Sequence, residues 1–287
     1  MSEVTIRIER PANRVARIVL ARADKRNAQN PRMLYELDRA LSDAAADPDI
    51  HVIILAADGP DFSSGHDLSE PFKLPCAPVA TMEGAFDGPG IEGHFAFECE
   101  AFLGLCRRWR ELPKPTIAQV QGRVIAGGLM LMWPMDLIVA SDDAVFSDPV
   151  IAFGANGIEW FAHAFELGTR RAKELLFTGS SITAGEAHRA GMVNRVVAPG
   201  RLEQETLELA ERIALRPSLA LKLAKMSVNR SQDAQGFQLA IDNAFALHSL
   251  AHAANLSEHG GIIDPAGIDI VRKDARNGKE VSTSPEP

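Results

Sequence analysis

Two glycine-containing segments have the residue types and positions to stabilise negative charge on a carbonyl oxygen. Residues 61–68 (DFSSGHDL) follow a nearly continuous apolar strand predicted at 51–56, and residues 122–129 (GRVIAGGL) follow another predicted strand at 116–121. Each segment could place backbone N–H groups at the start of a helix, and two such groups aimed at one point form an oxyanion hole. The alternative for either segment alone is that its glycines only permit a turn or close packing.

Two acidic residues further along the chain are candidate acid/base groups. Glu159 precedes Trp160 and Phe161, and desolvation beside these rings would raise its pKa toward the range useful for proton transfer. The structural alternative is a glutamate at a helix N-terminus, favoured by the helix dipole. Asp148 precedes Pro149 and is either a second acid/base or a residue of a helix N-terminal turn.

Three histidines have both a chemical and a structural interpretation. His66 belongs to the first glycine segment, so its ring either transfers a proton or packs in the wall of the pocket. His163 lies in an apolar helical segment and is expected to be structural, whereas His94, in the proline- and glycine-rich loop at 69–94, is expected to be exposed. No His/Cys/Asp cluster has the spacing of metal ligands, so we expect no metal, redox cofactor or prosthetic group.

Composition excludes several classes of protein. The 287 residues carry a net charge of −8, which argues against nucleic acid as the main partner. The longest uncharged apolar run, residues 124–135, is shorter than the ~20 residues of a membrane span. The N-terminal sequence MSEVTIRIER has no secretory pattern, and three cysteines without a metal-type pair favour free cytosolic thiols. These features predict a cytoplasmic protein that does not bind membranes.

The elements that must position these residues alternate between strands and helices, which predicts an α/β fold with parallel pairing. Apolar and alternating patterns predict strands at 4–8, 15–20, 51–56, 116–121 and 137–140. Helices are predicted at 31–46, 95–111, 127–133, 169–178, 183–190, 200–215, 217–230 and 235–256. We expect Trp109 and Trp133 in the core and Trp160 beside the site, and a frayed tail beyond residue 277.

Several segments, taken in order, resemble the crotonase, or enoyl-CoA hydratase/isomerase, superfamily. They are residues 23–28 (ADKRNA), 62–68, 122–131 with Asp136, 172–179 (AKELLFTG) and 187–197, which contains GMVN at 191–194. The resemblance spans residues 5–255 and implies a crotonase-like spiral of ββα units with a helical C-terminal region. It implies an α/β core at 1–198, a helical trimerisation region at 199–258 and a partly flexible tail at 259–287.

The resemblance also implies roles for individual residues. The two oxyanion amides fall on His66 and Gly127, which would hold the thioester oxygen of an acyl-CoA while an enolate forms. Coenzyme A, present only as part of the substrate, would contact these two residues and six others, namely Lys25, Arg26, Ala28, Ser64, Asp67 and Leu68. For the two cations of that set, a solvated turn is an equal alternative.

The sequence departs from the family at the two glutamates that handle water in its hydratases. Their positions align with Met130 and Val150, which accept no proton, so the standard two-glutamate hydration is not expected. Isomerases, dehalogenases and naphthoate-type synthases of the family use another acid, and Glu159 lies one residue from that place.

The sequence therefore predicts an acyl-CoA enzyme with oxyanion-stabilised enolate chemistry and an unusual acid/base. Double-bond isomerisation, hydration by another base and hydrolysis of a β-dicarbonyl unit are all compatible. The alternative is a catalytically inactive acyl-CoA-binding or scaffold protein; an RNA-binding member is disfavoured by the charge. The resemblance implies a homotrimer or a dimer of trimers.

Overall fold

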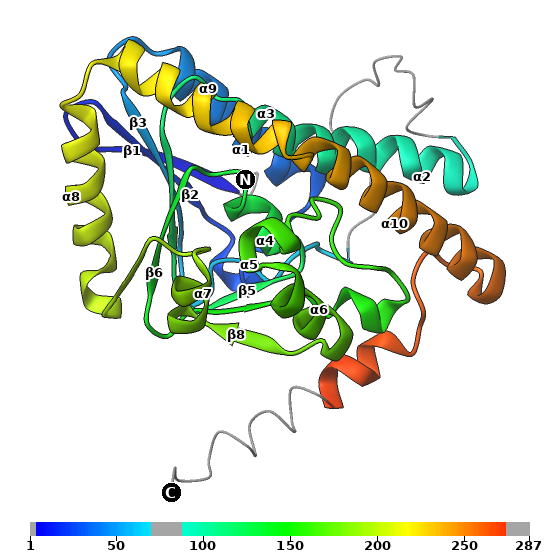
Figure 1. Ribbon diagram of the computed structural model, residues 1–287. Helices are drawn as coiled ribbons and strands as arrows, with labels where there is room; N and C mark the ends of the chain where they lie inside the picture. The colour runs from blue at the N-terminus through cyan, green and yellow to red at the C-terminus, as the bar shows by residue number, and fades with distance from the viewer. Residues whose placement is uncertain (1–3, 70–87, 274–287) are drawn as a thin grey trace, which may run out of the picture.

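A six-stranded sheet lies toward one side of the molecule, on the left in Figure 1. The computed structural model describes residues 4–69 and 88–273. The strands, in spatial order, are β1 (Ile6–Ala12), β2 (Val15–Leu20), β3 (Val52–Ala57), β4 (Thr116–Val120), β6 (Leu137–Ser141) and β9 (Arg195–Val197). β1 and β2 are antiparallel, and every later pair is parallel. β3 and β4 are almost wholly buried, and the continuous apolar sequence of β3 is typical of a strand covered on both faces.

A second, three-stranded sheet lies beside the first and holds one of the glycine segments. Its strands are β5 (Arg123–Ile125), β7 (Val145–Ser147) and β8 (Ser181–Thr183). These strands and β9 were not predicted from the sequence, because three residues are too few to show a period of two.

Helices cover both faces of the main sheet. The first part of the chain contributes η1 (Ala23–Lys25), α1 (Pro31–Ala46), α2 (Gly90–Glu98), η2 (Cys99–Gly104), α3 (Leu105–Arg110) and α4 (Gly127–Met132). The middle contributes η3 (Pro149–Phe153), α5 (His163–Leu167), α6 (Thr169–Thr178), α7 (Ala184–Ala190) and η4 (Pro199–Arg201). The C-terminal part contributes α8 (Leu202–Ala214), α9 (Ser218–Ala234) and α10 (Phe237–His259).

The helix that follows residue 198, α8, packs on the sheet. α8 contacts β3, β4 and β6 and buries Leu202, Leu209 and Ala210 in an apolar cluster on one face of the sheet. At roughly 1.5–3 kcal/mol for each fully buried large apolar side chain, this contact is part of what stabilises the sheet. Of the region expected at 199–258, α8 thus lies directly on the sheet.

Helix boundaries follow the sequence signals where a cap is present. α1 begins at Pro31 because the Asn30 side chain accepts a hydrogen bond from the Met33 N–H, which satisfies one of the unpaired donors of the first turn. The helix expected at 95–111 instead begins at Gly90 and contains a π-helical segment, η2. Such segments are often found at functional sites.

α9 and α10 follow one another along one side of the molecule, with α2 beside α10 (Figure 1). This packing sets the C-terminal half of α10 against α2. The chain then turns back, and residues 267–273 form a last helical segment. The tail expected from residue 259 is therefore partly structured, while its part beyond 277 lies outside the described residues.

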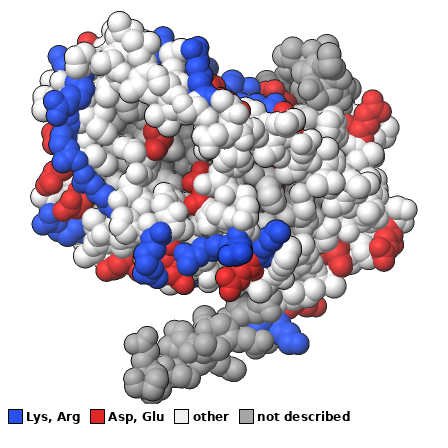
Figure 2. Space-filling model, in the orientation of Figure 1, with Lys and Arg blue, Asp and Glu red and all other residues white. Residues whose placement is uncertain are grey.

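Charge is distributed without a continuous basic face on the side shown in Figure 2. Lysine and arginine lie among aspartate and glutamate around its edge, and much of its centre is uncharged. Among the described helices, none combines the length and apolarity needed to cross a bilayer.

Candidate active site

A cavity of about 330 Å³ brings together residues from both glycine segments, Glu159 and helices α2 and α10. Its lining residues are Ser64, His66, Leu68, Glu98, Phe102, Ile125, Ala126, Pro149, Val150, Phe153, Ile158, Glu159, His248, His252, Ile262, Ile263 and Val271. Its wall is mainly apolar, and no lysine or arginine of the described chain lines it. An apolar cavity with a few convergent polar groups has the character of a small-molecule site.

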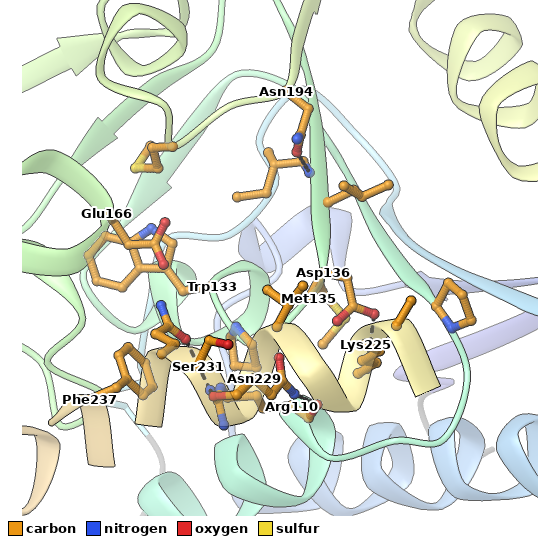
Figure 3. Close-up of a pocket in the computed structure, with 18 of the residues that line it drawn as sticks. Arg110, Trp133, Met135, Asp136, Glu166, Asn194, Lys225, Asn229, Ser231 and Phe237 are labelled. Atoms are coloured by element: carbon orange, nitrogen blue, oxygen red, sulfur yellow. Dashed lines mark hydrogen bonds and ion pairs between the residues drawn. The ribbon is translucent and has the colours of Figure 1, made fainter. Parts of the chain in front are cut away.

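A second cavity, of about 620 Å³, lies between α9 and the rest of the molecule (Figure 3). Lys225 on α9 contacts Asp136 at 2.9 Å, and the Arg110 guanidinium lies 4.8 Å from the centre of the Phe237 ring. Neither glycine segment reaches this larger cavity. We therefore place the candidate site in the smaller one, where the groups suited to chemistry converge.

The two glycine segments lie side by side. Short parallel bridges join Ser63 to Val124 and Gln29 to His66. Gly127 is the first residue of α4, so its N–H has no acceptor within the helix, and no acceptor of the described residues takes its place. A Cβ on Gly65 would lie 3.3 Å from the Gly127 nitrogen, which shows how closely the segments approach.

Ala126 gives the second segment an unusual backbone. Its φ is +47°, a conformation that glycine adopts easily and that costs other residues roughly 1–3 kcal/mol. Such strain is held by surrounding structure, and here the Ala126 N–H donates to the Ser147 carbonyl on β7 while its own carbonyl accepts from Leu129. The strained turn places Ala126, the residue before α4, in the cavity wall.

Residues of the 23–28 segment are held by a buried polar framework. The Asn27 side chain donates to the carbonyls of Asp58 and Asp61, and Arg22 forms a buried ion pair with Asp67 at 3.1 Å. The Arg26 carbonyl accepts from the Ser64 N–H. This framework fixes the entry segment to the first glycine segment.

The coenzyme A contacts expected from the resemblance are placed as follows. Lys25 and Arg26 are exposed, Ala28 and Ser64 are half-buried, and Leu68 is exposed at the cavity rim. The Asp67 carboxylate is engaged by Arg22 and Ser69, so its visible role is to hold the segment.

Glu159 lies in the cavity wall, only 4% exposed. Its Oε2 is 3.3 Å from His66 Nε2, and its Oε1 is 3.7 Å from His248 Nε2. Burial by itself raises the pKa of Glu159, as expected from the sequence, but the charge of His66 and its hydrogen bond outweigh burial and lower the pKa below its ordinary value. The expected direction of the shift was therefore wrong, and Glu159 is a carboxylate at neutral pH.

The His66 ring completes this pair. It stacks on Phe102 of η2, with ring centres 4.2 Å apart and planes 19° from parallel. Burial lowers the pKa of His66, but the Glu159 charge and hydrogen bond raise it above its ordinary value. The side chain thus faces Glu159 while its own backbone belongs to the first glycine segment.

Asp148 and His163 form a separate buried pair outside the cavity. Asp148 accepts hydrogen bonds from Val150 N, Ile158 N and His163 Nε2, the last at 2.8 Å. Both side chains are fully buried, which agrees with a structural His163 and gives Asp148 the turn role rather than that of an acid/base. Trp160 was expected beside the site, but it is buried in the core against Phe237 and does not line the cavity.

Sequence reasoning missed Glu98, His248 and His252, and misplaced His94. Glu98 is 2% exposed, and three Nε2 atoms surround its Oε1, from His94 at 2.9 Å, His252 at 3.3 Å and His248 at 3.9 Å. His94 is therefore half-buried in a side-chain cluster rather than exposed. The only signal in the sequence was the spacing of four residues between His94 and Glu98 and between His248 and His252, which places each pair on one helix face.

The positions of the two absent glutamates are apolar in space as well. Met130 is buried in the core, with its carbonyl accepting from the Cys106 thiol, and Val150 lines the cavity. Trp109 and Trp133 are in the core, as expected.

Comparison with known proteins relates most of the chain to one family. The family model described as Enoyl-CoA hydratase/isomerase matches residues 10–260. The chain is 42% identical over 276 residues to EchA13 of Mycobacterium tuberculosis, a candidate enoyl-CoA hydratase, covering 93% of this chain and 86% of that protein. It is 32% identical over 243 residues to the short-chain-enoyl-CoA hydratase of Clostridium acetobutylicum, covering 83% and 84%.

Solved structures agree with the sequence relatives. A candidate enoyl-CoA hydratase of Mycobacterium smegmatis superposes with a TM-score of 0.83 at 46% identity, covering 91% of this chain and 100% of that one. An enoyl-CoA hydratase/isomerase of Xanthobacter autotrophicus Py2 gives 0.78 at 29% identity, covering 99% and 100%. The fold class predicted from the sequence is confirmed, and the chain belongs to the enoyl-CoA hydratase/isomerase family.

Proposed function

We propose that the protein is an acyl-CoA enzyme that stabilises a thioester enolate and moves a proton with Glu159. The observation that carries the proposal is the convergence of the two glycine segments and Glu159 on one cavity. The backbone N–H groups of His66 and Gly127 would bind the thioester oxygen, and each such donor contributes roughly 3–4 kcal/mol to lowering the barrier.

Glu159 is suited to remove a proton from the acyl chain. It is ionised because His66 lowers its pKa, and the buried, apolar wall strengthens its electrostatic interactions. A single carboxylate can take a proton from one carbon and return it to another. Because Val150 replaces a water-handling glutamate in the cavity wall, double-bond isomerisation fits this arrangement better than hydration.

The second candidate function is binding of an acyl-CoA without turnover. It is favoured by the apolar side chains of Met130 and Val150 at the positions of the usual acids. Steady-state assays on enoyl-CoA and β-keto-CoA thioesters distinguish the two candidates, with isothermal calorimetry on the same compounds. Tight binding without turnover of any compound would leave the binding protein as the function.

We further propose that α9 and α10 pack against other copies of the chain. Several large apolar side chains on these helices are more than half exposed, among them Leu219, Leu223, Val228, Leu239, Leu247 and Leu250. Burying such a surface is favourable at roughly 25 cal/mol per Å². Light scattering is expected to give a trimer or a dimer of trimers, and a monomer would contradict this proposal.

A further inference from the structure

The cluster around Glu98 differs from an ordinary ion pair, because more than one histidine nitrogen points at the same carboxylate oxygen. Nε2 atoms of His94 and His252 lie 2.9 and 3.3 Å from one carboxylate oxygen, Glu98 Oε1. The other oxygen, Oε2, accepts no hydrogen bond from any described residue. All charged partners of Glu98 in the described chain are histidines, with no lysine or arginine among them.

The protonation of His252 can be assigned from its second ring nitrogen. Nδ1 lies 2.6 Å from the Ile262 carbonyl, and a carbonyl only accepts, so Nδ1 carries a hydrogen. In the neutral ring, Nε2 therefore presents a lone pair to the lone pairs of the Glu98 carboxylate. A cation between the two atoms, either a proton or a metal ion, removes this conflict.

Protonating all three histidine rings would place positive charges close together. The ring centres of His94 and His252 are 5.1 Å apart, and those of His248 and His252 are 4.3 Å apart. Imidazolium charges this close would repel one another. One divalent ion would neutralise the Glu98 carboxylate and accept a lone pair from Nε2 of His94 and one from Nε2 of His252.

The geometry matches a transition-metal site. Ligands bound at about 2.0–2.2 Å on a tetrahedral ion lie about 3.3–3.6 Å apart, close to the observed 2.9 and 3.3 Å. In metal sites, a ligating histidine usually donates a hydrogen bond from its other ring nitrogen, which orients the ring. The hydrogen bond from His252 Nδ1 to the Ile262 carbonyl is of this kind. Glu98 and His252 also line the cavity, which leaves room for a further ligand.

We propose that His94, Glu98 and His252 bind one divalent transition-metal ion, with Zn²⁺ the ion best suited to two imidazoles and a carboxylate. The three ligand atoms lie within 4.8 Å of one another. The open position faces the cavity and takes an oxygen donor, either water or a carbonyl or carboxylate oxygen of an acyl group. This departs from the sequence-based expectation of no metal, because the ligands come from two helices far apart in the chain.

The test is metal binding by the whole purified chain, without any acyl-CoA, so that it is independent of the proposed reaction. The protein is stripped with a chelator and titrated with Zn²⁺, with Co²⁺ as a spectroscopic probe, and bound metal is measured by mass spectrometry. We expect one ion per chain, a visible Co²⁺ absorption band, and a Tm that rises with Zn²⁺.

The variants His94→Ala and His252→Ala are expected to bind about 100-fold more weakly or not at all, by comparison with the 10–100-fold loss seen when outer contacts are removed. His259→Ala, an exposed histidine on the same helix as His252, is the matched control and retains binding. Circular dichroism verifies that each variant is folded. If His252→Ala does not fold, the half-buried His94 still provides the test.

Two results would overturn the proposal. One is wild-type protein that binds no stoichiometric ion and gives no Co²⁺ band. The other is His94→Ala protein that binds as tightly as wild type. In either case the histidines serve Glu98 as proton-bridged partners only.

Discussion

Replacing Glu159 with glutamine tests the proposed acid/base directly. The amide keeps the volume and one oxygen near His66 Nε2, which lies 3.3 Å from Glu159 Oε2, so the cavity wall is expected to survive. The variant loses the group that accepts a proton. General acid/base catalysis contributes typically 10²–10⁴-fold, so kcat is expected to fall by that factor, or about 3–5 kcal/mol of barrier at 1.36 kcal/mol per tenfold.

The structure adds a second expectation for this variant. Glu159 is the group that raises the pKa of His66, so that pKa is expected to fall in Glu159→Gln when measured by NMR titration. KM is expected to change little, because the proposed oxyanion amides and coenzyme A contacts remain. The assay is steady-state turnover of enoyl-CoA thioesters at neutral pH, first on wild type to find a substrate.

Glu166→Gln is the matched control, because Glu166 is an acid that lines the other cavity. Its kcat is expected to equal that of wild type. The reasoning fails if Glu159→Gln retains kcat within roughly threefold of wild type on every active substrate. It also fails if the two variants lose equal activity, since the loss would then come from a general effect on the fold.

Three further predictions follow from contacts in the fold. Burial raises the pKa of Glu166 to about 7 from 4.5, so the stability that its protonated form contributes is lost as pH rises through 7. The free energy of unfolding of Glu166→Gln, measured by urea unfolding, should therefore exceed that of wild type by about 1–3 kcal/mol at pH 8. At pH 4 the variant should be no more stable than wild type. In Gly127→Ala the new Cβ would lie 2.8 Å from His66 Cε1 and displace the ring that contacts Glu159, so kcat/KM should fall about 10²-fold. The variant keeps the Gly127 N–H, so unchanged activity would show that the reaction tolerates a displaced His66 ring. Arg22→Met leaves Asp67 buried without its charged partner and should cost about 3–5 kcal/mol in the free energy of unfolding. A loss below about 1 kcal/mol would show that the pair is solvated.

Local signals in the sequence were sufficient for much of the fold. The apolar run at 51–56 and the Asn30–Pro31 start of α1 predicted β3 and α1 closely, because burial on two faces and capping leave their mark on consecutive residues. Short strands such as β5 were missed, and so was the packing of α8 on the sheet, which depends on contacts between distant segments.

For the candidate site, the sequence determined which chemical groups are available. The order of the glycine segments and the apolar residues at Met130 and Val150 are visible in the chain itself, because residue type alone decides whether a side chain can hold a proton. The family resemblance also led to the expectation that Glu159 lies at the candidate site, and Glu159 does line that cavity.

Only the tertiary structure decided how these groups act. Glu98 and His252 face one another because α2 packs on α10, and no spacing along the chain reports that contact. The direction of the Glu159 pKa shift likewise depends on whether burial or the His66 charge is the stronger effect. Electrostatic energies vary with distance and burial in space, and the linear order of residues specifies neither.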